Sequence, residues 1–167
     1  MWDVKLGVGA FSDFEGSARR GVRFPGHAIT CYEWDRECVS VFGVEVLDRD
    51  DISVLPVAGF VWKPRCDLVC ELVFPRPKMR VQLNNNRAMY VAGELGGGTW
   101  AIKRPDFGND NFTYRDLRVT FGIMEFGKET DGALEIGWGF DRHLEFRSGA
   151  PVDSLDSALI LRCQTHY

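Results

Sequence analysis

No apolar run in this 167-residue sequence approaches the roughly 20 residues that a membrane-spanning helix needs. Histidine is scarce, and none of the five cysteines forms a Cys-x-x-Cys pair, so the sequence does not point to metal chemistry. The net charge of −4 offers no basic surface for nucleic acid. We therefore expect no metal, no cofactor and no nucleic-acid partner, with the cysteines packed as free thiols.

Helical periodicity is almost absent, whereas apolar and polar residues alternate with the period of two that is typical of β-strands. Turn-forming residues separate the alternating runs. The runs cover residues 2–11, 20–34, 39–47, 52–62, 67–74, 79–83, 88–95, 99–103, 113–124, 133–147 and 159–167. These eleven runs become ten if Gly96-Gly97-Gly98 is a bend within one long strand and not a tight turn, and we predict about nine or ten strands. We predict a single all-β domain over 1–167, an antiparallel up-and-down transmembrane β-barrel or partial barrel.

Three features favour a membrane barrel over a soluble one. The centre of each apolar stripe lacks charged residues, which are costly at the bilayer midplane. Aromatic residues gather near strand ends, as in an interfacial girdle. They include Phe112 and Phe140, and the residues expected to face lipid or form the girdle are Trp2, Trp34, Phe60, Trp62, Phe121, Trp138 and Tyr167. The opposite face carries charges of both signs, which we expect to form a network in the lumen: Lys5, Arg23, Glu45, Glu71, Glu94, Arg118, Glu135 and Arg162.

The last nine residues, 159–167, are apolar on one face, polar on the other, and end on an aromatic. This pattern looks like the closing strand of a bacterial outer-membrane barrel, similar to the signal that barrel-assembly machinery reads. The expected partners are thus outer-membrane lipid and that machinery. An outer-membrane protein must be exported, and no signal precedes the first strand, so we expect a fragment that lacks a signal peptide and N-terminal strands.

Other observations keep a soluble, lipocalin-like ligand-binding barrel open as an alternative. Residues 39–74 are apolar on both faces, as in a strand buried on both sides of a soluble fold. Pro25 and Pro56 lie inside strand segments, where each removes a ladder hydrogen bond and implies a bulge.

Several segments resemble a planctomycete family of uncharacterised outer-membrane β-barrels. They are Gly43–Ile52, Leu55–Pro64, Phe74–Lys78, Tyr90–Trp100 and Phe140–Gly149, in matching order. The similarity runs from about Leu6 to Tyr167. It implies an outer-membrane location and a barrel architecture, but no reaction.

The sequence offers few candidates for chemistry, and we assign no catalytic residue. His143 and Glu145 share a strand face near Ser148, so a barrel hydrolase that uses this pair is an alternative function. The run Asp48-Arg49-Asp50-Asp51 lacks the glycine and distal glutamate of a calcium loop, and we interpret it as a solvated hairpin tip. The charged face either lines an ion or solute path or fills a narrow barrel and makes it rigid.

Overall fold

The computed structural model describes residues 1–12, 21–47, 49–104, 108–127, 131–149 and 153–166. Within these ranges the chain is all-β. Thirteen strands occur there: β1 Trp2–Leu6, β2 Gly9–Ala10, β3 Val22–Arg23, β4 Gly26–Glu33, β5 Cys38–Val46, β6 Val54–Arg65, β7 Leu68–Phe74, β8 Lys78–Asn84, β9 Arg87–Arg104, β10 Gly108–Phe126, β11 Asp131–Phe146, β12 Asp153–Leu155 and β13 Ala158–His166.

The strands form one antiparallel sheet in which most neighbours follow each other along the chain. Its order is β1-β4-β5-β6-β7-β8-β9-β10-β11, after which β12 and β13 pair with two successive stretches of β11. Eleven strands of the described chain thus occupy ten positions in this sheet. The short β2–β3 pair continues the β1–β4 hairpin beyond Pro25. The prediction of an antiparallel all-β sheet with about ten strand positions is confirmed.

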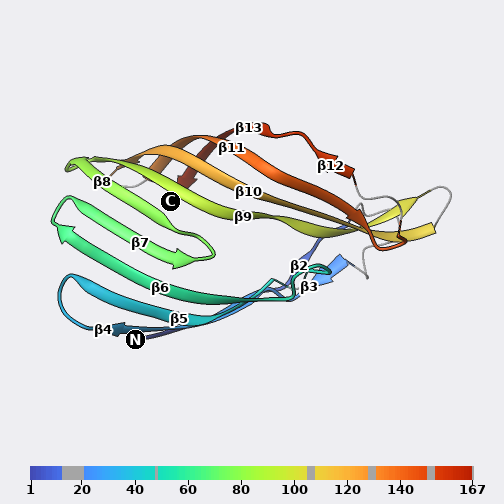
Figure 1. Ribbon diagram of the computed structural model, residues 1–167, viewed down its shortest axis with the longest axis horizontal. Coiled ribbons are helices and arrows are strands. Elements are labelled where there is room, and N and C mark those ends of the chain that lie inside the picture. The colour runs from blue at the N-terminus through green and yellow to red at the C-terminus, as the bar shows by residue number, and fades with distance from the viewer. Residues whose placement is uncertain (13–20, 48, 105–107, 128–130, 150–152, 167) are drawn as a thin grey trace.

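The sheet folds back on itself. Figure 1 shows one limb made of β4, β5 and β6, an opposite limb made of β9, β10, β11 and β13, and the β7–β8 hairpin between them. The two edges, β1 and β13, do not pair with each other among the described residues. The sheet therefore has an outer, convex face and an inner, concave face.

β9 is one continuous strand, so Gly96-Gly97-Gly98 is a bend and not a hairpin turn. Gly97 has φ +111°, and a β-carbon there would lie 2.1 Å from the main-chain oxygen of Tyr114. Only glycine fits this backbone conformation and close approach without strain. The alternation of β9 reverses at this bend. Before it, the even-numbered Glu94 contacts side chains of the inner face, and after it the odd-numbered Thr99 does so.

Pro25 and Pro56, which were both expected to lie inside strands, behave differently in the structure. The ladder is interrupted at Pro25, between β3 and β4, as expected from the missing N–H group. The prediction of a bulge at Pro56 was wrong, because Pro56 pairs with Val44 in regular register. The pairing of β7 with β6 reaches only as far as Ala58, so Pro56 has a neighbouring strand on one side only, where proline is tolerated.

Candidate functional site

The outer face of the sheet is apolar and exposed. Large hydrophobic side chains alternate with inward residues along neighbouring strands, and Phe121, Ile136 and Trp138 are 41%, 48% and 50% exposed. The exposed hydrophobic residues on β9, β10, β11 and β13 also include Val91, Leu117, Val119, Ile123, Leu134, Phe140, Leu159 and Leu161. On β5 and β6 the exposed hydrophobic residues are Phe42, Val44, Val54, Phe60 and Trp62. We call these residues together the outer belt.

The height of the outer belt can be estimated on β10. Its exposed apolar residues run from Leu117 to Ile123, and seven residues at about 3.4 Å each give roughly 24 Å. Strands of transmembrane barrels are tilted by about 35–45°, so this length along the strand corresponds to a height of about 17–20 Å, somewhat less than the apolar band of about 25 Å that surrounds such barrels. Beyond Leu117, β10 continues to Gly108 with mostly buried or half-buried residues. The belt therefore covers one part of each long strand and not its whole length.

The inner face is polar along β10 and β11, whereas the buried residues of β5, β6 and β7 include the apolar side chains of Val41, Leu55, Val57 and Cys70. The buried polar and charged residues of the described chain include Asp116, Thr120 and Glu135, none more than 6% exposed. Neighbouring residues on the same strands are the exposed hydrophobics of the outer belt. A water-soluble barrel has the opposite arrangement, since its apolar side chains leave water on folding.

One row of the inner face runs directly across four adjacent strands. Tyr90, Gly122, Glu135 and Arg162 are register partners on β9, β10, β11 and β13. The Tyr90 hydroxyl donates a hydrogen bond to Glu135 across Gly122. A β-carbon on Gly122 would lie 2.4 Å from the Tyr90 ring, so the glycine is needed for this contact. Lys78 covers the same ring, with its Nζ 4.1 Å from the ring centroid.

Arg162 connects this row to a second one. Its guanidinium lies 3.3 Å from Glu135 and 3.2 Å from Glu94. Arg118, the register partner of Glu94, lies 3.6 Å from that carboxylate and 2.8 Å from Asp116. We call Tyr90, Glu94, Asp116, Arg118, Glu135 and Arg162 the inner-face network. Its two arginines and three carboxylates largely offset one another, as charges in a narrow space of low dielectric must.

The predicted charge network is thus divided. Glu94, Arg118, Glu135 and Arg162 come together in the inner-face network. Arg23 instead pairs with Asp50, 3.2 Å away, and Glu45 pairs with Arg76. Lys5 and Glu71 form no ion pair within the described ranges.

Sequence reasoning did not select Tyr90 or Asp116 for the network. Both stand on the face that holds Glu94 and Arg118, two or four residues along the same strand. This position on the same strand face was the signal in the sequence that could have added both residues to the network. The contact across Gly122 depends in addition on the register between strands, which alternation alone does not give.

The turn between β5 and β6 is only partly solvated: Arg49 is buried and Asp51 is half-buried, whereas Asp50 and Ser53 remain accessible to solvent, so the interpretation as a solvated hairpin tip was wrong for Arg49 and Asp51. We call residues 47 and 49–53 the inner turn; Asp48 lies outside the described residues. Arg49 is only 6% exposed. It donates two hydrogen bonds to the carboxylate of Asp51, with nitrogen–oxygen distances of 2.9 and 2.7 Å. Arg49 also donates to the main-chain oxygens of Gly96 (3.2 Å) and Tyr114 (3.3 Å). These bonds replace the water that an exposed charge would keep, which explains how the Arg49 guanidinium can be buried.

The aromatic residues expected to face lipid are exposed wherever the structure describes them. Trp2, Trp34, Phe60, Trp62, Phe121 and Trp138 are between 41% and 79% exposed, and Tyr167 lies outside the described residues. Phe112 instead stacks between Trp100 and Phe146, at centroid distances of 5.8 and 5.7 Å. These three rings form a row across β9, β10 and β11, beyond the end of the outer belt.

The geometry gives no support to a dyad of His143 and Glu145. The ring of His143 is hydrogen-bonded to Asp141, at 2.9 Å, and both side chains are accessible to solvent. The hydroxyl of Ser148 donates to Asp110 at 2.6 Å. Asp141 has φ +49° and lies at the register shift between β10 and β11, so the bulge turns this carboxylate toward the imidazole.

The described residues contain no metal-binding cluster, no disulfide and no membrane-spanning helix. No group of three or more His, Cys, Asp or Glu side chains there is placed to hold a metal ion. All five cysteines are free thiols. No helix among these residues is long and apolar enough to cross a membrane.

Comparison with known proteins adds no relative. No protein-family model matches the chain, and neither the curated proteins nor the solved structures contain a match. The functional argument therefore depends on the geometry of this chain.

Proposed function

We propose that this chain forms an outer-membrane β-barrel domain with a structural or channel-like role, whose outer belt contacts lipid and whose inner-face network lines the lumen. The observation that carries this proposal is the alternation of exposed Phe121, Ile136 and Trp138 with buried Thr120 and Glu135 on adjacent strands. Exposed to water, a continuous apolar surface of this extent drives association. Against acyl chains it is the favoured solvent-facing surface.

Two further observations support the proposal. The exposed apolar residues of β10 are confined to one stretch of the strand, from Leu117 to Ile123, as in the apolar band around a transmembrane barrel. β13 exposes Leu159 and Leu161 on its outer face, which is the feature of the terminal strand that we expect assembly machinery to recognise. The proposed similarity to the planctomycete barrel family leads to the same location.

In lipid, unpaired main-chain groups at a sheet edge are costly. The proposed membrane form therefore needs partners for β1 and β13, either each other or further strands. The same requirement does not hold for a soluble ligand-binding barrel, because water can pair with the main-chain groups of an exposed edge.

The proposal is tested by refolding the chain from urea into detergent micelles, into phospholipid vesicles and into buffer alone. We expect a band on an unheated gel that shifts on boiling only in the two amphiphile samples, because a closed barrel resists the denaturing detergent until it is heated. A compact monomer that forms in buffer without amphiphile would contradict the proposal and favour the soluble barrel.

A further inference from the structure

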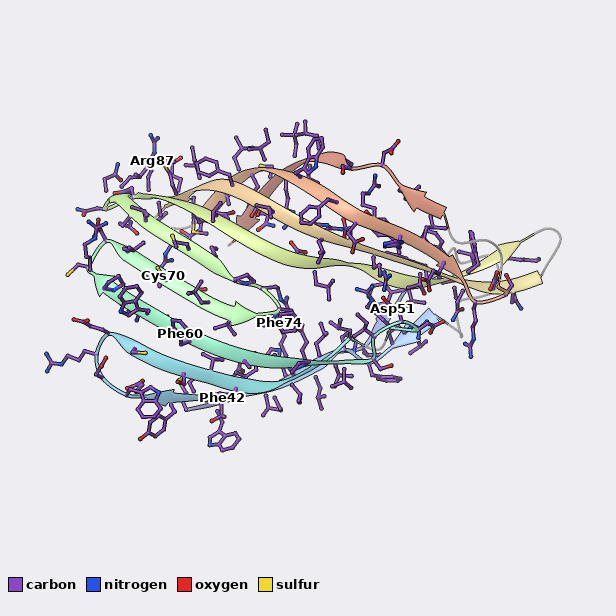
Figure 2. All side chains as sticks on the ribbon, in the orientation of Figure 1. Phe42, Asp51, Phe60, Cys70, Phe74 and Arg87 are labelled. Carbon is purple, nitrogen blue, oxygen red and sulfur yellow. The ribbon has the colours of Figure 1, made fainter. Side chains whose placement is uncertain are left out.

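The inner turn contacts side chains on three strands that are distant in the sequence, β3, β9 and β10. Asp50 is its centre: its main-chain N–H donates to Thr99 on β9 at 3.1 Å, and its carboxylate accepts from Asn111 on β10 at 2.7 Å. The same carboxylate lies 3.2 Å from Arg23 on β3 and 4.0 Å from Arg147, just after β11. The turn itself belongs to the limb made of β4, β5 and β6. Figure 2 places Asp51 between the two limbs, at the end where they approach each other.

The short β7–β8 hairpin explains why the turn can lie there. β7 pairs with β6 only as far as Ala58, and β8 pairs with β9 only as far as Ala92. Past those residues no described strand separates β6 from β9. The inner turn and Phe11 occupy this position: Ala101 on β9 donates its main-chain N–H to the oxygen of Phe11 at 3.0 Å.

The lining of this end is balanced in charge. A polar cavity of about 440 Å³ adjoins the inner turn, and its charged lining residues are Arg23, Arg49, Asp50, Asp51, Glu145 and Arg147. Three cations face three anions, so the path favours neither sign. Solutes suited to such a lining are small, hydrophilic and without a large net charge.

We propose that the inner turn is a plug that closes the solute path of the lumen, with Arg49 as its latch, and that small polar solutes pass when the latch is released. This inference rests on the proposed function, because a solute path exists only if the chain forms a barrel in a membrane. Arg49 acts by positioning: it holds Asp51 within the turn and two main-chain oxygens on the facing limb with one guanidinium. Planar, bidentate geometry of this kind is specific to arginine.

The test compares Arg49→Ala, Arg49→Lys and the wild-type protein in phospholipid vesicles loaded with a small neutral sugar or a small dye. Arg87→Ala is the matched control, since Arg87 also pairs with a carboxylate, Glu125, but is exposed at the opposite end of the fold (Figure 2). We expect Arg49→Ala to leak several-fold faster than wild type, Arg49→Lys to lie between them, and Arg87→Ala to match wild type. Heat-modifiable migration on a gel confirms that each variant has folded.

The outcomes separate the two proposals. A wild-type protein that inserts and folds, but leaks as fast as Arg49→Ala, would overturn the plug and leave the barrel intact. Equal low leakage from folded wild type and folded Arg49→Ala would do the same. If Arg49→Ala does not fold, the comparison of Arg49→Lys with wild type decides. Failure of the wild-type protein to enter vesicles would overturn the proposed function and the plug together.

Discussion

The Tyr90 hydroxyl reaches the carboxylate of Glu135 across an intervening strand, and it does so over a glycine. The two residues stand on β9 and β11, with Gly122 of β10 between them. The contact ties three strands together within one register row. The Tyr90 side chain fills the space over Gly122, so this position must have no side chain.

Gly122→Ala is expected to destabilise the protein by about 1–3 kcal/mol, the usual cost of inserting a methyl group into a packed interior. The added β-carbon would lie 2.4–2.7 Å from atoms of the Tyr90 ring. The measurement is the urea midpoint of unfolding in vesicles or micelles. Gly132→Ala is the control, because its β-carbon would meet nothing closer than 4.0 Å. Equal midpoints for the two variants would contradict the packing described here.

Arg162→Met is expected to cost about 3–5 kcal/mol, because it leaves the buried carboxylate of Glu135 without its cationic partner. The Tyr90 hydroxyl remains as a donor but carries no charge. Arg87→Met removes an exposed ion pair with Glu125 and should cost less than about 1 kcal/mol. Urea midpoints again give the comparison. A loss for Arg162→Met no larger than that for Arg87→Met would show that the inner-face network does not stabilise the fold.

Phe121→Arg places a charge in the middle of the outer belt. If the belt faces lipid, the substitution should cost about 2–4 kcal/mol and reduce the fraction of chains that fold into vesicles. Asn109→Arg, on the same strand but outside the belt, should fold as wild type does. On a soluble protein an exposed position such as Phe121 tolerates arginine within about 0.5 kcal/mol, so unchanged folding of Phe121→Arg would argue against a lipid-facing surface.

Alternation in the sequence predicted the longer strands and the two faces of β10, but it did not predict the short β12. Leu117, Val119, Phe121 and Ile123 are exposed, whereas Asp116 and Arg118 on the other face contact each other inside. The apolar stripe of β9 even changes parity in the sequence, from Met89 and Val91 to Trp100 and Ile102. The structure explains this change by the bend at Gly97.

The inner turn could not be predicted in the same way. An acidic run such as Asp50-Asp51 gives the same turn signal whether water or protein surrounds it. Its position against other strands depends on contacts of Asp50 with Thr99, Asn111 and Arg23, which are distant in the sequence. It also depends on the shortness of the β7–β8 hairpin, which leaves β9 accessible. Such non-local contacts leave no periodic pattern in a single sequence.

The most direct test of the lipid-facing outer belt is quenching of Trp138 fluorescence by phospholipids with brominated acyl chains, in a variant that keeps only this tryptophan. Trp138 is half-exposed at the centre of the belt on β11. A second variant that keeps only Trp100, which stacks on Phe112 beyond the belt, is the control. The account predicts strong quenching of Trp138 and weak quenching of Trp100. Equal, weak quenching of both in a folded protein would contradict it.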